Sequence, residues 1–254
     1  MAIEELKCEI KENNVYNMDC VEGLRLLGDE SVDLVVTDPP YEVNYNNKST
    51  ELEKLGKSRE AQIKRDESFV DVILDYNVIS EELFRVLKKD RHVYLFCGDR
   101  QIVKWSNAMT KAGFKSPQII VWKKNKTTFD MTFGYKFPEN KEFILFFQKG
   151  WSKLNGYEVE RHRFRSVLEF DSSDDTGFHS CAKPIDLLMF LTSASSKPND
   201  LCLDLFCGGG NHIIAFKRIK RRFIGFELST PYYETIIKRL DEENKQLTMD
   251  DFLQ

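Results

Sequence analysis

Hydrophobic positions along this chain fall into short continuous apolar runs, separated by longer segments in which apolar residues recur with a helical period. The short runs are rich in β-branched and aromatic residues, which is typical of strands buried on both faces of a sheet. These runs predict strands at Val32–Val36, Val93–Cys97, Gln118–Trp122, Phe143–Phe147, Leu201–Phe206 and Phe223–Glu227.

The longer segments predict helices beside these strands. They are expected at Cys20–Leu27, Phe69–Lys88, Gln101–Lys111, Ile185–Ser195, Asn211–Lys220 and Pro231–Lys245. In the last of them, Tyr233, Ile236, Ile237 and Leu240 share one helix face. The alternation of strands and helices favours an α/β fold, in which an open, mostly parallel sheet carries helices on both faces. We expect one domain that spans residues 1–254.

Two stretches interrupt the alternation. Residues 42–68 are polar and rich in lysine, and they follow a predicted strand directly. A connection of this length is commonly a functional loop, so we expect a lid. Residues 125–182 mix aromatic and charged residues around one predicted strand, and we expect a small recognition insertion there.

The charge balance does not by itself indicate a nucleic-acid-binding protein, because the net charge is −4 at pH 7. Such an average can conceal basic patches, and basic residues do cluster at Lys123–Lys126, Arg161–Arg165 and Lys217–Arg222. Clusters of this kind also occur on ordinary solvated surfaces. They are therefore candidates for nucleic-acid contact only if other features point the same way.

Several classes of protein are disfavoured. No apolar run reaches the roughly 18–20 residues that cross a bilayer, and residues 1–11 lack the apolar core of a secretory signal. The six cysteines are scattered without a Cys-x-x-Cys pair, so we interpret them as reduced thiols and expect no metal site. These features predict a cytoplasmic protein that is not inserted in a membrane.

The first candidate for chemistry is the tetrapeptide Asp38-Pro39-Pro40-Tyr41, directly after a predicted strand. Its two prolines stiffen the turn and donate no N–H. The turn therefore offers free carbonyl groups together with one carboxylate and one aromatic ring. The carboxylate and a proline carbonyl could each accept one N–H of an amine on a flat heterocycle, and the ring could stack on that heterocycle. Two such acceptors would localise the delocalised lone pair of the amine. The alternative is a rigid turn that only ends a strand.

The second candidate is the glycine-rich segment after Asp204, which lies between a predicted strand and a predicted helix. Glycines at such a turn allow the backbone to approach a ligand closely. Glu227 ends the next predicted strand, where an acid suits ribose hydroxyls. Together these features indicate a site for an adenosine-containing cofactor, and a tight structural turn is the alternative. Because both candidates follow strands, they share the edge at which open α/β sheets bind ligands.

With these motifs, the sequence resembles the DNA amino-methyltransferases of permuted order, in which the catalytic motif precedes the cofactor motif. Asp38–Tyr41 is similar to the catalytic tetrapeptide of that family, and Asp204-x-Phe206-x-Gly208-x-Gly210 is similar to its cofactor loop. Further likeness is carried by Asp19-Cys20, Ser31–Leu34, His179-x-x-x-Lys183-Pro184 and Ser195-x-x-Pro198-x-Asp200.

The resemblance implies a Rossmann-like fold and direct methyl transfer from S-adenosylmethionine to N6 of an adenine flipped out of DNA. The implied catalytic residues are Asp38, Pro39, Pro40 and Tyr41. The implied cofactor-binding residues are Asp19, Lys183, Asp204, Phe206, Cys207, Gly208, Gly210, Asn211 and Glu227. Lysine and arginine suit contacts to phosphates and bases, and the expected DNA-binding residues are Lys123, Lys124, Arg161, Arg163 and Arg165.

The sequence departs from the family pattern after the glycines. The family loop usually ends Gly-Ser-Gly-Thr-Thr, whereas this loop ends with Gly210, Asn211 and His212. Asn211 or backbone groups would have to replace hydroxyl contacts to the cofactor, and we expect His212 on the helix surface. Lys183 is expected near the methionine carboxylate of the cofactor, and the alternative is a surface lysine before a helix.

Aspartate at the first position of the tetrapeptide favours adenine, because cytosine-N4 members of the family more often have serine there. The open alternatives are a cytosine-N4 methyltransferase, an RNA adenine-N6 methyltransferase and an inactive nucleic-acid-binding homologue. A dinucleotide-dependent oxidoreductase would leave Asp38–Tyr41 unexplained. DNA is the expected partner. A homodimer or an accessory protein could complete recognition, and a cognate restriction endonuclease would be a separate chain.

Overall fold

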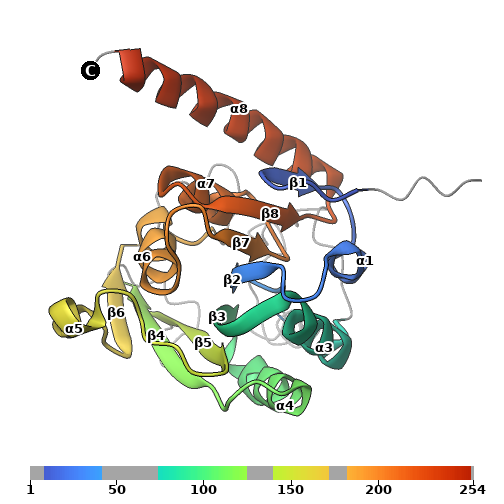
Figure 1. Cartoon of the computed structure of the whole chain (residues 1–254), viewed down its shortest axis with the longest axis vertical. Helices are drawn as coiled ribbons and strands as arrows, with labels where there is room; N and C mark the ends of the chain where they lie inside the picture. Colours follow the sequence, from blue (N-terminus) through green and yellow to red (C-terminus); the bar gives the residue numbers. More distant parts are fainter. Residues whose placement is uncertain (1–8, 42–73, 125–139, 172–181, 253–254) are drawn as a thin grey trace, which may run out of the picture.

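The computed structural model describes residues 9–41, 74–124, 140–171 and 182–252 (Figure 1). Within these residues the centre of the fold is an eight-stranded sheet with the order β1-β8-β7-β2-β3-β5-β4-β6. β5 is antiparallel to both of its neighbours, and every other pairing among these strands is parallel. The strands are β1 Asn14–Tyr16, β2 Val32–Thr37, β3 Leu87–Cys97, β4 Gln118–Lys124, β5 Lys141–Lys149, β6 Val167–Phe170, β7 Leu201–Asp204 and β8 Arg222–Phe226.

Helices cover both faces of the sheet, as Figure 1 shows. α1, α3 and α4 pack on one face, whereas α6, α7 and α8 pack on the other. The helices of the described residues are α1 Cys20–Leu26, α3 Tyr76–Val86, α4 Ile102–Ala112, α5 Tyr157–Glu160, α6 Ile185–Ser195, α7 Asn211–Arg218 and α8 Thr230–Phe252, with 3-10 turns η2 Asp99–Gln101 and η3 Arg161–Arg163. This layered arrangement confirms the predicted α/β fold.

The central strand β2 shows why continuous apolar runs predict this sheet. Val32 and Val35 pack toward the layer of α1 and α3, whereas Leu34 and Val36 pack toward α6 and α7. All four side chains are completely buried. A strand that is covered on both faces needs apolar residues at almost every position, so the alternation of a half-exposed strand is absent.

One buried carboxylate interrupts the apolar run of β2. Asp33 accepts hydrogen bonds from Lys88 Nζ at 2.9 Å, from Arg91 Nη2 at 2.8 Å and from the backbone N–H of Leu201 at 3.0 Å. Burial alone would raise the pKa of Asp33, but these three donors outweigh burial, so the pKa lies below its ordinary value. One side chain therefore ties together the amino ends of β2, β3 and β7.

The junction between α3 and β3 differs from the expectation. The predicted helix ran to Lys88, but α3 ends at Val86 and β3 begins at Leu87; the first residues of that helix lie outside the described part of the chain. β3 therefore has 11 residues, whereas the prediction covered only Val93–Cys97. Its first half contains Lys88–Arg91, whose side chains are partly or fully exposed, so the apolar pattern did not reveal it.

Two short strands were not predicted at all. β1 has three residues and β6 has four, and each forms one end of the sheet. Segments this short carry too few positions for a clear periodicity. The predicted strand Leu201–Phe206 is shorter than expected and ends at Asp204, because the chain turns there into the glycine-rich loop.

The predicted lid, residues 42–68, lies outside the described residues, as do 125–139 and 172–181 of the predicted recognition insertion. The remainder of that insertion begins with β5, which lies between β3 and β4 inside the central sheet. α5, η3 and β6 follow at one end of the sheet, so this part of the insertion is built into the fold. In the ranges that the structure describes, none of the helices could serve as a membrane span.

Candidate active site

The two predicted motifs meet at one edge of the sheet. β2 and β7 are parallel neighbours that end at this edge, at Thr37 and Asp204. Thr37 Oγ1 donates a hydrogen bond to Asp204 Oδ1 at 2.8 Å and accepts one from the N–H of Leu205 at 3.1 Å. The residue that precedes the tetrapeptide is thus bonded to the start of the glycine-rich loop.

Asp38 is in contact with a buried lysine. Lys183 lies just before α6, and only 2% of its side chain is exposed. Its Nζ lies 2.6 Å from Asp38 Oδ2 and 3.1 Å from Glu142 Oε2. The alternative of a surface lysine is therefore wrong, since a buried ammonium between two carboxylates is part of the charge balance of the site.

Glu142 is a residue of this site that the sequence pattern did not indicate. It stands at the start of β5, and because β5 is antiparallel to β3 and β4, its amino end lies where those strands end. The hydroxyl of Tyr41 donates to Glu142 Oε2 at 3.1 Å, and Lys124 Nζ lies 2.5 Å from Glu142 Oε1. Lys124, which was predicted to contact DNA, is thus engaged within this cluster.

These charges shift one another's protonation. Burial raises the pKa of Asp38 above its ordinary value; Lys183 opposes the rise and Glu142 adds to it. Burial would also raise the pKa of Glu142, but Lys183 and Lys124 outweigh it and lower that pKa. Burial disfavours the Lys183 ammonium, yet Asp38 and Glu142 prevail and raise its pKa. At neutral pH the pair of Lys183 and Glu142 is therefore ionised.

The rest of the tetrapeptide is also anchored. The ammonium of Lys183 lies 5.2 Å from the centre of the Tyr41 ring and 5.5 Å from the centre of the Phe96 ring. Gln101 Nε2 donates a hydrogen bond to the carbonyl of Pro40 at 3.0 Å. The turn is therefore held through one proline carbonyl, and the tyrosine ring is held at both its face and its hydroxyl.

The glycine-rich loop joins β7 to α7 at the same edge. Gly208 and Gly210 have φ angles of +49° and +88°, in the left-handed region that strains any side chain. A Cβ on Gly210 would also lie 3.1 Å from Ile236 of α8. The N–H of Gly208 donates to Glu227 Oε2 at 2.7 Å, which ties the loop to the end of β8.

Two further predicted residues flank this loop. β1 and β8 are parallel neighbours, so Asp19 and Glu227 follow strands that end at the same edge as Asp204. The carboxylate of Asp19 caps α1 by accepting from the N–H groups of Val21 at 2.8 Å and Glu22 at 3.2 Å. Burial raises the pKa of Glu227. The fold thus brings three carboxylates to this edge of the sheet.

His212 is buried, which corrects the prediction of a helix-surface position. It is 4% exposed, its Nδ1 lies 3.4 Å from Asp204 Oδ2, and its ring packs edge-on against Phe96. Burial lowers the pKa of His212 to about 4 and raises that of Asp204 to about 7. α7 begins at Asn211, directly after the loop, so its first turn faces the site.

Asn211 is bonded within the protein at both ends of its amide. Its Nδ2 donates to the carbonyl of Lys183 at 2.8 Å, and its Oδ1 accepts from Arg239 Nη1 at 2.8 Å. These bonds join the loop to α8 and to the segment that carries Lys183. Asn211 is therefore better placed to support the loop than to replace the hydroxyl contacts of the family pattern.

Residues 32–239 match the family model of the N6/N4 DNA methylases. The matched range runs from the start of β2 into α8 and includes both motifs. The chain belongs to the N6/N4 DNA methylase family. As such it is a DNA methyltransferase, and S-adenosylmethionine is its methyl donor.

Individual relatives agree with this assignment. The type II methyltransferase M.HindIII of Haemophilus influenzae is 23% identical over 297 residues, with 90% of this chain and 95% of the relative covered. M.HinfI of Haemophilus influenzae is 29% identical over 253 residues, with 91% and 68% covered.

Solved structures of methyltransferases share the fold of this methylase. The M1.HpyAVI complex with S-adenosylmethionine superimposes with a TM-score of 0.65 at 24% identity, covering 89% of this chain and 98% of the other. The cytosine-N4-specific PvuII DNA methyltransferase gives a TM-score of 0.68 at 17% identity, covering 89% and 86%.

The residues of the methylase fit its cofactor and an amine substrate. Among the described residues, the side-chain atoms Asp38 Oδ1, Asp204 Oδ2 and His212 Nε2 are buried without a hydrogen-bond partner. Buried polar atoms in folded proteins are nearly always paired, so three such atoms at one sheet edge indicate a site that a ligand completes. The glycines of the turn beside them carry no side chain, which suits a close approach of the backbone to an adenosine.

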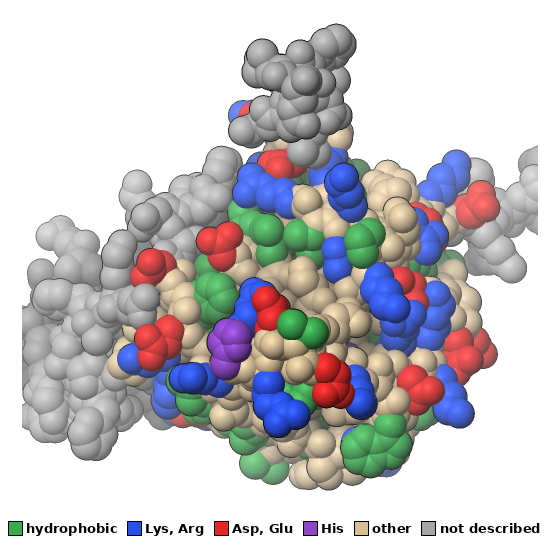
Figure 2. Space-filling model, turned by 60° about the vertical axis from the view of Figure 1, so that its left-hand side comes forward, with side chains coloured by type: hydrophobic (Ala, Val, Ile, Leu, Met, Phe, Trp, Pro, Cys, Tyr) green, Lys and Arg blue, Asp and Glu red, His purple; other side chains and the backbone are tan. Residues whose placement is uncertain are grey.

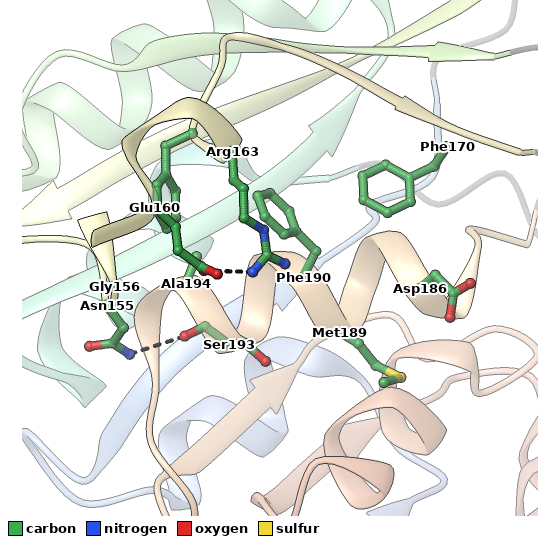
Figure 3. A pocket seen from close by; sticks show the side chains of 11 residues that line it. Asn155, Gly156, Glu160, Arg163, Phe170, Asp186, Met189, Phe190, Ser193 and Ala194 are labelled. Atoms are coloured by element: carbon green, nitrogen blue, oxygen red, sulfur yellow. Dashed lines mark hydrogen bonds and ion pairs between the residues drawn. The ribbon is translucent and has the colours of Figure 1, made fainter. Parts of the chain in front are cut away.

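Of the predicted DNA contacts of the methylase, Lys124 lies in the site, whereas the three arginines lie near β6 at one end of the sheet. η3 carries Arg161 and Arg163, and it borders a pocket of about 530 Å³ against α6 (Figure 3). Arg163 Nη1 lies 2.6 Å from Glu160 Oε2, Arg165 Nε donates to a backbone carbonyl, and Lys123 pairs with Glu169. Figure 2 shows acidic and basic side chains intermingled among the described residues on this side.

Proposed function

We propose that this methylase transfers a methyl group to N6 of adenine in DNA, with the base rotated out of the duplex. The environment of Asp38 carries the proposal: Lys183 holds one carboxylate oxygen, and the other is buried without a partner. The exocyclic amine of adenine would satisfy that oxygen by donating an N–H. A target without a donor would leave the oxygen unpaired, at a cost of about 1–3 kcal/mol.

The turn offers a second acceptor to the same amine. Because Gln101 occupies the carbonyl of Pro40, we assign the carbonyl of Pro39 to the other N–H. Two acceptors favour a pyramidal nitrogen and localise its lone pair for attack. The Tyr41 ring, fixed through Glu142, offers a stacking surface worth about 1–3 kcal/mol, which offsets part of the cost of unstacking the base.

The aspartate also suits the last step. A nitrogen that gains a methyl group becomes positively charged and has to release one proton. Asp38 is the carboxylate that would contact this nitrogen, and burial has raised its pKa above the ordinary value. A carboxylate with a raised pKa is a better proton acceptor than an exposed one.

S-adenosylmethionine supplies an electrophilic methyl group on a positively charged sulfur. The residues that we assign to its binding surround the loop and are Asp19, Asp204, Phe206, Cys207, Gly208, Gly210 and Glu227. Glu227 already accepts the N–H of Gly208 in the loop and that of Ser229 after β8, and it keeps lone pairs for ribose hydroxyls. We assign Asn211 a supporting role. The contact of Lys183 with Asp38 favours the side of the base over the methionine carboxylate.

The methylated product distinguishes the possible target bases. Incubation of unmethylated genomic DNA with labelled S-adenosylmethionine, followed by nucleoside analysis, is expected to yield N6-methyladenine. Formation of N4-methylcytosine would agree with methyl transfer to an exocyclic amine but would contradict adenine as the target base. The PvuII structure is a precedent for that outcome. Labelling of RNA alone would favour an RNA methylase. No incorporation by a cofactor-bound enzyme would favour an inactive homologue.

We also propose that Arg161, Arg163 and Arg165 contact the DNA backbone. Arg163→Ala is expected to weaken DNA binding and to reduce the salt slope of the affinity by about one. Glu160→Gln removes the ion-pair partner of Arg163, so it is expected to strengthen binding and steepen the slope. DNA titrations at several salt concentrations measure both. Identical slopes in the wild type and the two variants would exclude Arg163 as a phosphate contact.

The same proposal has consequences for the partners and the location of the protein. DNA is the macromolecular substrate, and a cytoplasmic location suits it. A homodimer or an accessory protein would extend the small surface around η3. The type II names of the relatives make a separate cognate endonuclease a natural partner.

A further inference from the structure

We propose that Lys183 and Glu142 form a positioning pair. Lys183 keeps Asp38 ionised, and Glu142 holds Lys183 and Tyr41 so that Asp38 and Tyr41 both face the target amine. The inference rests on the proposed function of Asp38 as the acceptor of an amine N–H. It adds a residue, Glu142, that neither the catalytic tetrapeptide nor the cofactor loop contains.

The geometry makes this pair a single unit. Lys183 Nζ bridges the two carboxylates, at 2.6 Å from Asp38 and 3.1 Å from Glu142. The same Glu142 oxygen accepts the hydroxyl of Tyr41, and the other oxygen lies 2.5 Å from Lys124. Glu142 therefore restrains both ends of the tetrapeptide, one through the lysine and one directly.

The lysine cannot easily move elsewhere. Its side chain is 2% exposed, and its ammonium also lies over the rings of Tyr41 and Phe96. Its carbonyl is bonded to Asn211, which anchors the backbone at this position. A buried ammonium that is satisfied by two carboxylates and two ring faces is strongly localised.

The charges define what the pair does. Without Lys183, the carboxylates of Asp38 and Glu142 would share a buried site, and one of them would take up a proton. A protonated Asp38 would present a donor to an amine that also donates. Lys183 prevents this protonation of Asp38. Glu142 acts in the opposite direction, because its negative charge attracts the same ammonium away from Asp38.

Asp204, which is bonded to Thr37, changes charge near neutral pH, because burial raises its pKa to about 7. Three other titratable groups near Asp38 do not carry charge at that pH. They are His212, whose pKa burial lowers to about 4, Cys97, whose pKa burial raises to about 12, and Tyr41, whose pKa lies well above its ordinary value. Lys124 faces Glu142 and is part of the same network. Near neutral pH, the charged groups that act most strongly on Asp38 are therefore Lys183 and Glu142.

The two partners should consequently act on Asp38 in opposite directions. Lys183→Met removes the positive charge and is expected to raise the pKa of Asp38 by about one to three units. Glu142→Gln keeps the shape, removes the negative charge and is expected to lower that pKa by about one unit. If Lys183 and Glu142 only filled space, the two substitutions would not shift the pKa of Asp38 in opposite directions.

Carbon-13 NMR of selectively labelled aspartate carboxyls in the full-length protein measures this pKa directly, and Asp38→Asn assigns the resonance. Lys183→Arg retains the charge and is expected to leave the pKa near that of the wild type. Lys153→Met removes an exposed charge that pairs with Glu158 and serves as the control. The acid limb of kcat against pH is expected to move with the NMR value in each variant, while cofactor affinity stays constant.

Shifts in the same direction, or no shift in Glu142→Gln, would overturn the inference. Glu142→Gln decides the matter alone if Lys183→Met does not fold. The NMR titration does not depend on turnover, so the inference is tested even if the enzyme methylates a base other than adenine. A product other than N6-methyladenine, combined with the opposed shifts, would refute the proposed base and keep the positioning pair.

Discussion

Asp38→Asn is expected to lower kcat for DNA methylation by at least about a hundredfold, because the amine loses its charged acceptor. The substitution preserves the volume of the side chain, but an amide can present an NH₂ group where the nitrogen needs an acceptor. It also leaves Lys183 with Glu142 as its remaining carboxylate partner in the cluster. Cofactor affinity is expected to change little, since Asp38 is assigned to the base.

Steady-state methylation and calorimetric titration with S-adenosylmethionine measure the two quantities separately. Asp186→Asn is the matched control: it removes an exposed carboxylate three residues after Lys183, and neither kcat nor cofactor affinity is expected to change. A variant of Asp38 that retained full turnover would exclude this residue as the acceptor. Loss of cofactor binding would instead place Asp38 on the cofactor side.

The part of the fold that the sequence predicts well is the part buried on both faces. β2, β7 and β8 have continuous apolar runs because helices cover them on either side. The exposed start of β3 and the short end strands β1 and β6 lack such runs, so no pattern revealed them. The direction of β5 depends on its connections at both ends, and composition carries no information on this.

Because the direction of β5 was not predicted, Glu142 was missing from the predicted site. Glu142 lies beside Tyr41 only because β5 is antiparallel, and the two residues are 101 positions apart in the chain. Asp38 and Asp204 could be placed at one edge because each follows a strand of the same parallel set. A residue at the start of an antiparallel strand reaches that edge as well, but only the pairing shows it.

Charge clusters were the least informative signal. Lys123 and Lys124 are neighbours on one strand, so their side chains point to opposite faces of the sheet. Lys124 pairs with Glu142 in the site, whereas Lys123 pairs with Glu169. His212 illustrates the same limit, since a polar residue in the first turn after a binding loop faces inward. Composition alone does not distinguish a solvated charge from one that is paired inside the protein.

The second large effect concerns stability. Asp33→Asn is expected to lower the free energy of unfolding by about 2–3 kcal/mol at pH 7, which corresponds to a fall in Tm of about 5–10 °C. Asp33 is buried and binds Lys88, Arg91 and the N–H of Leu201, so its loss releases the amino ends of three strands. Lys88 and Arg91 are partly exposed, so water can solvate them, which keeps the cost below that of a fully buried pair.

The pH dependence of the difference in unfolding free energy between the wild type and Asp33→Asn identifies the cause of that difference. Because the pKa of Asp33 is lower in the folded state, its contribution is fully present above the unfolded pKa of about 4 and is lost as the pH falls through the folded value. Denaturant unfolding is therefore expected to separate the wild type and the variant equally from about pH 5 to pH 8, and to bring them together in acid. Asp29→Asn breaks an exposed pair with Arg85 and is expected to cost less than about 1 kcal/mol. A gap between the wild type and Asp33→Asn that persisted unchanged in acid would mean that packing, rather than the carboxylate charge, holds these three strand ends together.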